Sequence, residues 1–161
     1  MGIIDLDRSD PDFLKDVARQ PGGEMIQACF TCRSCVAGCP ISAVNKEFSP
    51  AKIIRMAIYG LKDEVLRSDF VWLCATCYTC QERCPQGVNI TEFMTLLKNM
   101  AIKEGFAPAG IRAQLKLVTN DGRIYPIDDF DNKKRTKAGL PVLPTACKEI
   151  EKLFHKQTVA E

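Results

Sequence analysis

Eight of the nine cysteines in the 161-residue chain stand in two runs of identical spacing, C-x2-C-x2-C-x3-C followed by proline. The first run holds Cys29, Cys32, Cys35 and Cys39, and the second holds Cys74, Cys77, Cys80 and Cys84. Each cysteine of the second run lies 45 positions after its counterpart, so the sequence contains an internal repeat. The first three cysteines of each run have no histidine, aspartate or glutamate between them, which leaves thiolates as the ligands on offer. The chemistry that this pattern predicts is metal binding by sulfur.

This spacing is typical of proteins that bind two [4Fe–4S] clusters, in which the fourth cysteine of each run binds the other cluster. The predicted ligand sets are Cys29, Cys32, Cys35 and Cys84 for one cluster, and Cys74, Cys77, Cys80 and Cys39 for the second. On a continuous helix, steps of three residues would rotate successive sulfurs by about 60° around the axis. A loop can instead wrap three of them around one cluster. We therefore expect loops at both runs, with Pro40 and Pro85 turning the chain away.

Zinc and disulfide bonds are the alternatives to iron–sulfur clusters. Two all-thiolate zinc sites would also use eight cysteines, but structural zinc usually joins two C-x2-C pairs across a longer gap. The closely spaced third cysteine and the proline argue against zinc. A disulfide framework is disfavoured by the odd ninth cysteine and by an N-terminus with acids where a secretion signal carries positive charge. In a reducing compartment, clustered cysteines more often bind metals or do redox work.

Other residues that could do chemistry lie outside the eight cysteines. Cys147 is expected to be a small buried hydrophobic residue, with a reactive thiol as the alternative. His155 is the only histidine, so we expect no histidine-based catalytic pair, and we place it on the surface of a helix. No nucleotide-binding loop, nucleophile with a base or open metal position is evident, so no catalytic residue is predicted.

Positive charge accumulates near the first run. The residues concerned are Arg33, Lys46, Lys52 and Arg55. They could orient a partner, or they could form an ordinary solvated surface. Over the whole chain, 22 Lys and Arg face 20 Asp and Glu, and this balance gives no strong basic field for nucleic acid. No apolar run approaches the roughly 20 residues that cross a bilayer, so we expect a soluble cytoplasmic protein without membrane insertion.

Helices must position the two runs. After the first run, Ser49 and Pro50 provide an N-cap and a first helical residue. After the second, Asn89 with Glu92 resembles a capping box, and Gly105 is a candidate C-cap. Apolar residues at helical spacing follow both starts, and we expect them to form the core: Ile53, Ile54, Ala57, Ile58 and Leu61, then Ile90, Phe93, Met94, Leu97, Met100 and Ala101. The predicted fold is mainly α, with two [4Fe–4S] clusters in a pseudo-twofold repeat.

The predicted organisation has three segments: an N-terminal arm at 1–23, a two-cluster domain at 24–105 and a C-terminal extension at 106–161. In the arm we expect an extended piece through Ile3, Ile4 and Leu6, then a helix that begins at Asp10-Pro11. The residues before each run, 24–28 and 69–73, also read as helical. In the extension we expect the following elements: a helix through Ile111, Leu115 and Val118, a turn at Asp121-Gly122, a charged loop from Asp128 to Lys137, and a last helix from near Thr145 to Phe154. Such extensions often dock onto a partner.

The segment between the runs, Ile41 to Leu73, holds at least one capped helix, where small bacterial ferredoxins have short strands. In this respect the chain resembles the α-helical ferredoxin family of succinate dehydrogenase iron–sulfur subunits and heterodisulfide reductase. The stretches that carry the resemblance are CFTCRSC at 29–35, SPAKIIR at 49–55 and WLCATCYTC at 72–80. No plant-type cluster domain precedes them and no Cys-Cys pair follows. The chain is therefore most similar to the C-subunit family of heterodisulfide reductases from methanogenic archaea.

This resemblance implies a function. The C subunits of such complexes accept single electrons from the flavin subunit (A), which also carries iron–sulfur clusters, and pass them to the catalytic subunit (B). The catalytic subunit reduces the mixed disulfide of coenzyme M and coenzyme B. A hydrogenase or a formate dehydrogenase would feed the complex. The alternatives are a free two-cluster ferredoxin and the electron-transfer subunit of a related complex in sulfur metabolism.

Overall fold

The computed structural model describes residues 6–147, 150 and 153, and within these residues it contains helices and no strand. The prediction of a mainly α fold is confirmed. The chain divides into two compact units, Met1–Phe106 and Ala107–Glu161, and each unit is considered by itself. Within the described residues, none of the helices combines the length and apolar character that a membrane crossing requires.

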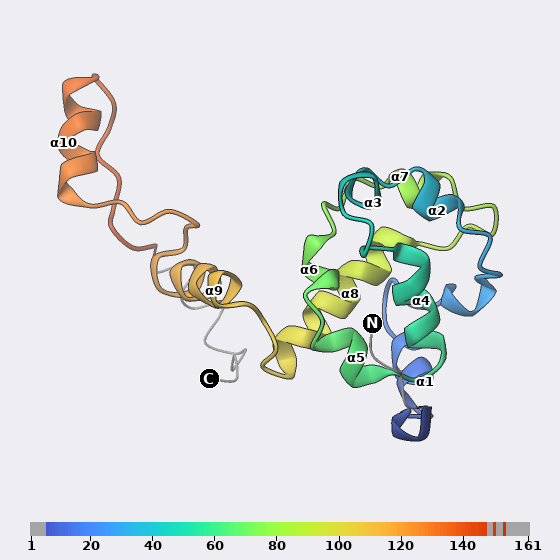
Figure 1. Cartoon of the computed structure of the whole chain (residues 1–161). Coiled ribbons are helices and arrows are strands. Elements are labelled where there is room, and N and C mark those ends of the chain that lie inside the picture. The colour runs from blue at the N-terminus through green and yellow to red at the C-terminus, as the bar shows by residue number, and fades with distance from the viewer. Residues whose placement is uncertain (1–5, 148–149, 151–152, 154–161) are drawn as a thin grey trace. The chain divides into compact units, whose positions relative to one another are not determined.

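The first unit is built from short helices around two longer ones (Figure 1). In chain order they are η1 (Leu6–Arg8), α1 (Phe13–Ala18), η2 (Ile26–Ala28), α2 (Ser34–Ala37), α3 (Pro40–Val44), α4 (Pro50–Ile58), α5 (Lys62–Leu66), α6 (Phe70–Leu73), α7 (Thr79–Glu82) and α8 (Ile90–Lys103). Helix α5 packs against both α4 and α8, while α1 packs against α4 and α6 packs against α8. The two helices that carry the cysteines Cys35 and Cys80, α2 and α7, also pack against each other.

The core of the first unit consists of the apolar faces of α4 and α8, as the spacing predicts. Ile54, Ala57, Phe93 and Leu97 are fully buried in it. Burial of a side chain of the size of Leu, Ile or Phe stabilises a fold by about 1.5–3 kcal/mol. Val17 of α1 is also fully buried, so the segment 1–23 contributes to this core.

The start of α4 is confirmed and the start of α8 is not. Ser49 Oγ accepts a hydrogen bond from the backbone N–H of Lys52 at 3.3 Å, and Pro50 is the first helical residue. Asn89 makes no side-chain capping bond, so the expected capping box is wrong. The reason is a tight turn in which the N–H of Ile90 donates to the carbonyl of Val88 at 2.8 Å. At φ −76° and ψ 65°, Asn89 has the backbone of an inverse γ-turn and not the extended backbone from which capping side chains reach the helix.

Both long helices end at a glycine with a left-handed backbone. At the end of α8, the N–H of Gly105 donates to Ile102 and the N–H of Phe106 donates to Ala101, so the predicted C-cap is confirmed. Gly60 ends α4 in the same way, at φ 73°. Its carbonyl also accepts from the N–H of Asp10 at 2.7 Å, which ties the N-terminal segment to the end of α4.

The flanking segments are less helical than their sequences suggest. Before the first run, the expected helix at 24–28 is only the single 3-10 turn of η2, and before the second run α6 covers Phe70–Leu73. Leu6, expected in an extended piece, lies in the 3-10 turn η1, which Ser9 closes by donating its N–H to the Leu6 carbonyl. The other residues of that piece, Ile3 and Ile4, lie outside the described residues.

The second unit contains α9 (Ala109–Asp121) and α10 (Asp129–Lys137). Helix α9 confirms the expected helix in this segment, and Gly122 at φ 67° ends it. Helix α10 corrects the prediction of a charged loop. Asp128 forms a capping box with Asp131, and acids in the first turn and bases in the last turn complement the helix dipole. The helix expected from Thr145 to Phe154 falls largely on residues 148–149, 151–152 and 154–161, outside the described part of the chain.

Candidate metal centres

The loops that carry the first three cysteines of each run share an unusual backbone. Thr31 and Arg33 have φ of 63° and 65°, and Thr76 and Tyr78 have φ of 50° and 63°. These residues occupy equivalent positions of the 45-residue repeat, and none is glycine. The left-handed region costs an ordinary residue roughly 1–2 kcal/mol, and most for β-branched residues such as threonine. The sequence repeat is therefore also a repeat of strained backbone that curls each loop around its cysteines.

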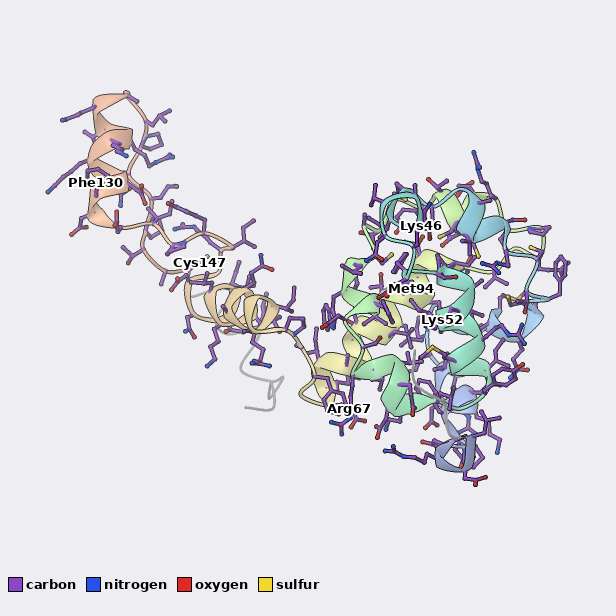
Figure 2. All side chains as sticks on the ribbon, in the orientation of Figure 1. Lys46, Lys52, Arg67, Met94, Phe130 and Cys147 are labelled. Atoms are coloured by element: carbon purple, nitrogen blue, oxygen red, sulfur yellow. The ribbon has the colours of Figure 1, made fainter. Side chains whose placement is uncertain are left out.

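Four cysteines line one cavity. Cys74, Cys77 and Cys80 of the second run lie there together with Cys39, which belongs to the first run. The rest of the wall is mainly apolar and comes from the loop before α4 and from the start of α8: Ile41, Phe48, Pro50, Ala75, Ile90, Thr91 and Met94. Figure 2 shows Met94 within the first unit. The structure thus brings together the four residues of one predicted ligand set.

The second predicted set is brought together in part. Burial raises the pKa of Cys35 to about 11, and the nearby thiols of Cys29, Cys80 and Cys32 raise it further. These three sulfurs are therefore close enough to interact with Cys35. The fourth member of the set, Cys84, accepts a hydrogen bond from the N–H of Val88 at 3.4 Å, and the described contacts do not join it to the first run.

The middle cysteine of each run is exposed and has a hydroxyl neighbour. Cys32 Sγ lies 3.3 Å from Ser34 Oγ, and Cys77 Sγ lies 3.6 Å from Thr79 Oγ1. Because a thiolate only accepts, the hydroxyl donates when the sulfur is ionised. This hydrogen bond lowers the pKa of both thiols. The two hydroxyls also occupy equivalent positions in the repeat, a sequence signal that could have identified them.

Thr91 has no such signal. It is 1% exposed, and its Oγ1 lies 3.6 Å from Cys80 Sγ. Burial raises the pKa of Cys80, whereas this hydrogen bond lowers it. The equivalent position in the first half of the repeat is Lys46, so nothing in the repeat marks Thr91 as a neighbour of sulfur.

The donor set fits iron–sulfur clusters. The ligands are thiolates, as the cluster requires, and backbone N–H groups approach two of the sulfurs, from Ser42 to Cys39 at 3.5 Å and from Val88 to Cys84. Within the described residues, no three His, Cys, Asp or Glu side chains could hold a single metal ion. The sulfurs of a [4Fe–4S] cluster need not converge in this way, because each binds a different iron.

The two remaining candidate residues lie in the second unit. Cys147 is partly buried, between the two alternatives expected for it, and its N–H donates to the Asp121 carbonyl at 3.2 Å. His155 lies outside the described residues.

Comparison with known proteins gives a consistent result. A family model described as "4Fe-4S dicluster domain" matches residues 25–88, which include all eight cysteines of the two runs. The chain is 35% identical over 159 residues to the C subunit of the H(2):CoB-CoM heterodisulfide,ferredoxin reductase of Methanothermobacter thermautotrophicus, covering 94% of this chain and 85% of the relative. It is also 35% identical to the iron-sulfur C subunit of the CoB--CoM heterodisulfide reductase of Methanopyrus kandleri, with the same coverage.

A third relative, the C subunit of the ferredoxin:CoB-CoM heterodisulfide reductase of Methanosarcina mazei, is 38% identical over 119 residues. The match covers 74% of this chain and 73% of that protein. Together with the eight cysteines inside the dicluster domain, these similarities establish that the chain carries two [4Fe–4S] clusters.

Proposed function

Because the chain belongs to the C-subunit family of heterodisulfide reductases, we propose that it relays single electrons within such an oxidoreductase complex. It takes electrons from the flavin subunit and delivers them to the catalytic subunit, which reduces the disulfide of coenzyme M and coenzyme B. The observation that carries this proposal is the pair of cysteine loops in one small helical unit, in a chain that matches these subunits over 94% of its length.

The clusters supply one-electron redox chemistry when they are bound. The residues of this chain hold them, shield them and adjust the charge at their sulfurs. The core helices α4 and α8 exclude water from Cys35 and Cys80, which are both buried. Ser34, Thr79 and Thr91 donate to sulfur and stabilise its negative charge.

We propose crossed ligation for the two clusters. One is held by Cys29, Cys32, Cys35 and Cys84, and the other by Cys74, Cys77, Cys80 and Cys39. The position of Cys39 in the cavity of the second run supports this assignment. Packing of α2 against α7 supports it as well, because it brings the two runs to neighbouring helices.

A pair of double variants tests the crossing. With crossed ligation, Cys32→Ala with Cys84→Ala damages one cluster and leaves about four irons per chain, while Cys32→Ala with Cys39→Ala damages both. Ligation within each run predicts the reverse. Iron analysis and electron paramagnetic resonance of the dithionite-reduced protein distinguish the two arrangements.

Membership of a complex is favoured over a free ferredoxin by the second unit. None of its described residues from 108 onward is buried, and such a segment gains stability when it docks on a partner. The partners are the flavin subunit and the catalytic subunit, with a hydrogenase or a formate dehydrogenase upstream, in the cytoplasm. A related complex of sulfur metabolism remains the second candidate, since the chain is 27% identical to a protein of Archaeoglobus profundus described as similar to the C subunit of heterodisulfide reductase.

Purification of the native protein under anaerobic conditions tests the function. We expect about eight irons and eight sulfides per chain, the resonance signature of two interacting reduced clusters, and co-elution with two larger subunits. Elution as a lone 17.9 kDa species would contradict the role as a subunit. Zinc in place of iron would contradict electron transfer altogether.

A further inference from the structure

A large groove lies beside the loop of the first run. Its volume is about 1020 Å³, and its walls come from that loop, from the segment before α4, and from α4 and α6. Four of its lining residues are cations: Arg33, Lys46, Lys52 and Arg55. Glu47 is the only acid among the lining residues. We call this surface the basic groove. Figure 2 marks Lys46 and Lys52 on the first unit.

The charges of the basic groove are not neutralised. Within the described part of the chain, none of the four cations takes part in an ion pair. Lys52 Nζ lies 5.2 Å from the centre of the Phe70 ring, and Arg55 donates to Tyr59 Oη at 2.7 Å. These aromatic contacts fix the positions of the two cations and leave their charge available.

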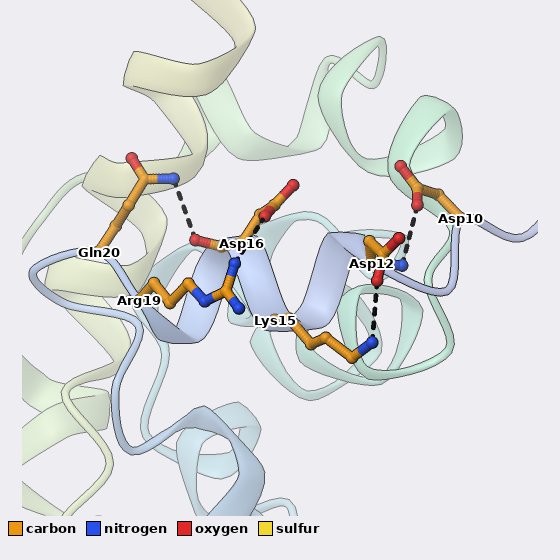
Figure 3. Close-up of polar contacts among 6 residues, drawn as sticks. All are labelled: Asp10, Asp12, Lys15, Asp16, Arg19 and Gln20. Carbon is orange, nitrogen blue, oxygen red and sulfur yellow. Dashed lines mark hydrogen bonds and ion pairs between the residues drawn. The ribbon is translucent and has the colours of Figure 1, made fainter.

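Other cations of the first unit differ in this respect. On α1, Lys15 Nζ lies 2.9 Å from Asp12 Oδ1, and Arg19 Nη1 lies 4.0 Å from Asp16 Oδ1 (Figure 3). Lys62 pairs with Glu104 at 2.9 Å. The unpaired charge is therefore concentrated in the groove and is not a general property of the surface.

The groove adjoins an exposed sulfur. Thr31 and Arg33 line it, and Cys32 lies between them in the chain and is exposed. A protein bound in the groove would touch the loop of the first cluster at its accessible ligand. This position suits electron exchange with a partner better than it suits a small anion, which would need no contact with the cluster loop.

The pseudo-twofold repeat does not extend to these charges. The positions equivalent to the four cations hold Tyr78, Thr91, Leu97 and Met100. Thr91 and Leu97 are buried, so the second half has no comparable basic surface at these positions. The two loops therefore present different chemistry to the outside.

We propose that the basic groove binds a carboxylate-rich segment of one of the two electron-transfer partners and so assigns that partner to the first cluster. This inference rests on the proposed function, and it adds which loop one partner uses and how it is recognised. Complementary charge raises association rates by 10-fold or more at low salt, and the effect falls as salt rises.

A groove variant and a matched control test the proposal in the cluster-loaded protein. The groove variant combines Lys46→Gln, Lys52→Gln and Arg55→Gln, and Arg33 is kept because it shapes the cysteine loop. The control combines Lys15→Gln, Arg19→Gln and Lys103→Gln, which removes the same number of charges elsewhere. Iron content and the midpoint of thermal cluster loss verify that both variants are folded.

Stopped-flow electron exchange with the purified flavin and catalytic subunits, over a range of salt concentrations, is the first measurement. We expect the groove variant to react about tenfold more slowly at low salt with one of these two partners only, and the control to match the unmodified protein. Equal rates for groove variant and control with both partners would overturn the inference.

Binding of poly-L-glutamate keeps the test independent of the proposed function. If the unmodified protein exchanges electrons with neither partner, the proposed function fails, and the polymer still decides whether the groove recognises carboxylates. Salt-sensitive binding that the groove variant loses and the control retains would support the inference. Equal binding by the two variants would overturn it.

Discussion

At the scale of single residues, the two clusters have different surroundings. Thr91 donates to the buried sulfur of Cys80, and the second residue of α4, which matches Thr91 in helix position, is Ala51 with no hydroxyl. Hydrogen bonds to sulfur favour the reduced, more negative cluster. The cluster at Cys80 therefore has the higher reduction potential from this effect.

Thr91→Val should lower the potential of that cluster. A hydrogen bond that strengthens by about 1 kcal/mol on reduction corresponds to roughly 40 mV in a one-electron couple. Redox titration followed by electron paramagnetic resonance measures the shift. Thr91→Ser is the control, because it keeps the hydroxyl and should keep the potential. Unchanged potentials in Thr91→Val would contradict the role of Thr91.

The cysteines themselves should differ in reactivity when the clusters are absent. The pKa of Cys35 is raised to about 11 from an ordinary 9.0, mainly by burial, so this thiol is protonated at pH 8. The hydroxyl neighbours lower the pKa of Cys32 and Cys77. Iodoacetamide at pH 8 should therefore label Cys32 and Cys77 first and Cys35 last, as measured by peptide mass spectrometry.

The same shift predicts how stability depends on pH. A raised pKa means that the fold favours the neutral thiol of Cys35, so this contribution is fully present below pH 9.0 and is lost as the pH rises toward about 11. The cluster-free protein should lose stability in this range. Uniform labelling of all cysteines at pH 8 would show that the chain does not keep this fold without its clusters.

Sequence alone identified the residues that repeat and missed those that do not. The spacing of the cysteines marks them as ligands, because thiolates at these intervals have few other uses. Thr91 comes near Cys80 only through the packing of α7 against α8, and no pattern in the chain encodes that contact.

At the scale of elements, the ends of helices decide which predictions hold. Ser49 and Gly105 were predictable because a single residue forms each cap. Asn89 was not, because the turn at Val88 removes it from the capping geometry. Helix α10 was missed because its charge suggested a loop, although the same charges are arranged in the order that a helix dipole favours.

Gly60 and Gly105 offer a matched test of these ends. Both have a left-handed backbone, at φ 73° and 78°. A Cβ at Gly60 would lie 2.3 Å from the Asp10 carbonyl oxygen, whereas a Cβ at Gly105 would meet nothing within 4 Å. Gly105→Ala should cost about 1 kcal/mol and Gly60→Ala several times more, because only Gly60 must also displace the N-terminal segment. The midpoint of thermal cluster loss measures both, and equal shifts would contradict this explanation.

At the scale of the whole molecule, clusters and docking belong to different parts of the chain. The core surrounds the cysteines in the first unit, while α9 and α10 have no buried residues. Sequence could predict this separation only coarsely, because it shows an amphipathic helix through Leu115 without showing what covers it.

Deletion of residues 107–161 should leave the clusters in place and remove the protein from its complex. We expect about eight irons per chain and unchanged resonance spectra, together with loss of co-elution with the other subunits. The control is the full chain prepared in the same way. Loss of iron on truncation would show that the second unit supports the cluster domain itself.

The strained loops have a consequence for a protein exposed to oxygen. Four residues that are not glycine hold left-handed backbone around the cysteines: Thr31, Arg33, Thr76 and Tyr78. The bonds from sulfur to iron oppose the relaxation of these residues, so destruction of a cluster releases conformational energy at the surface of the molecule. Chemical damage is thereby converted into an open, cleavable loop. A protease that removes such chains would distinguish the damaged protein from the intact one by shape, without having to recognise iron.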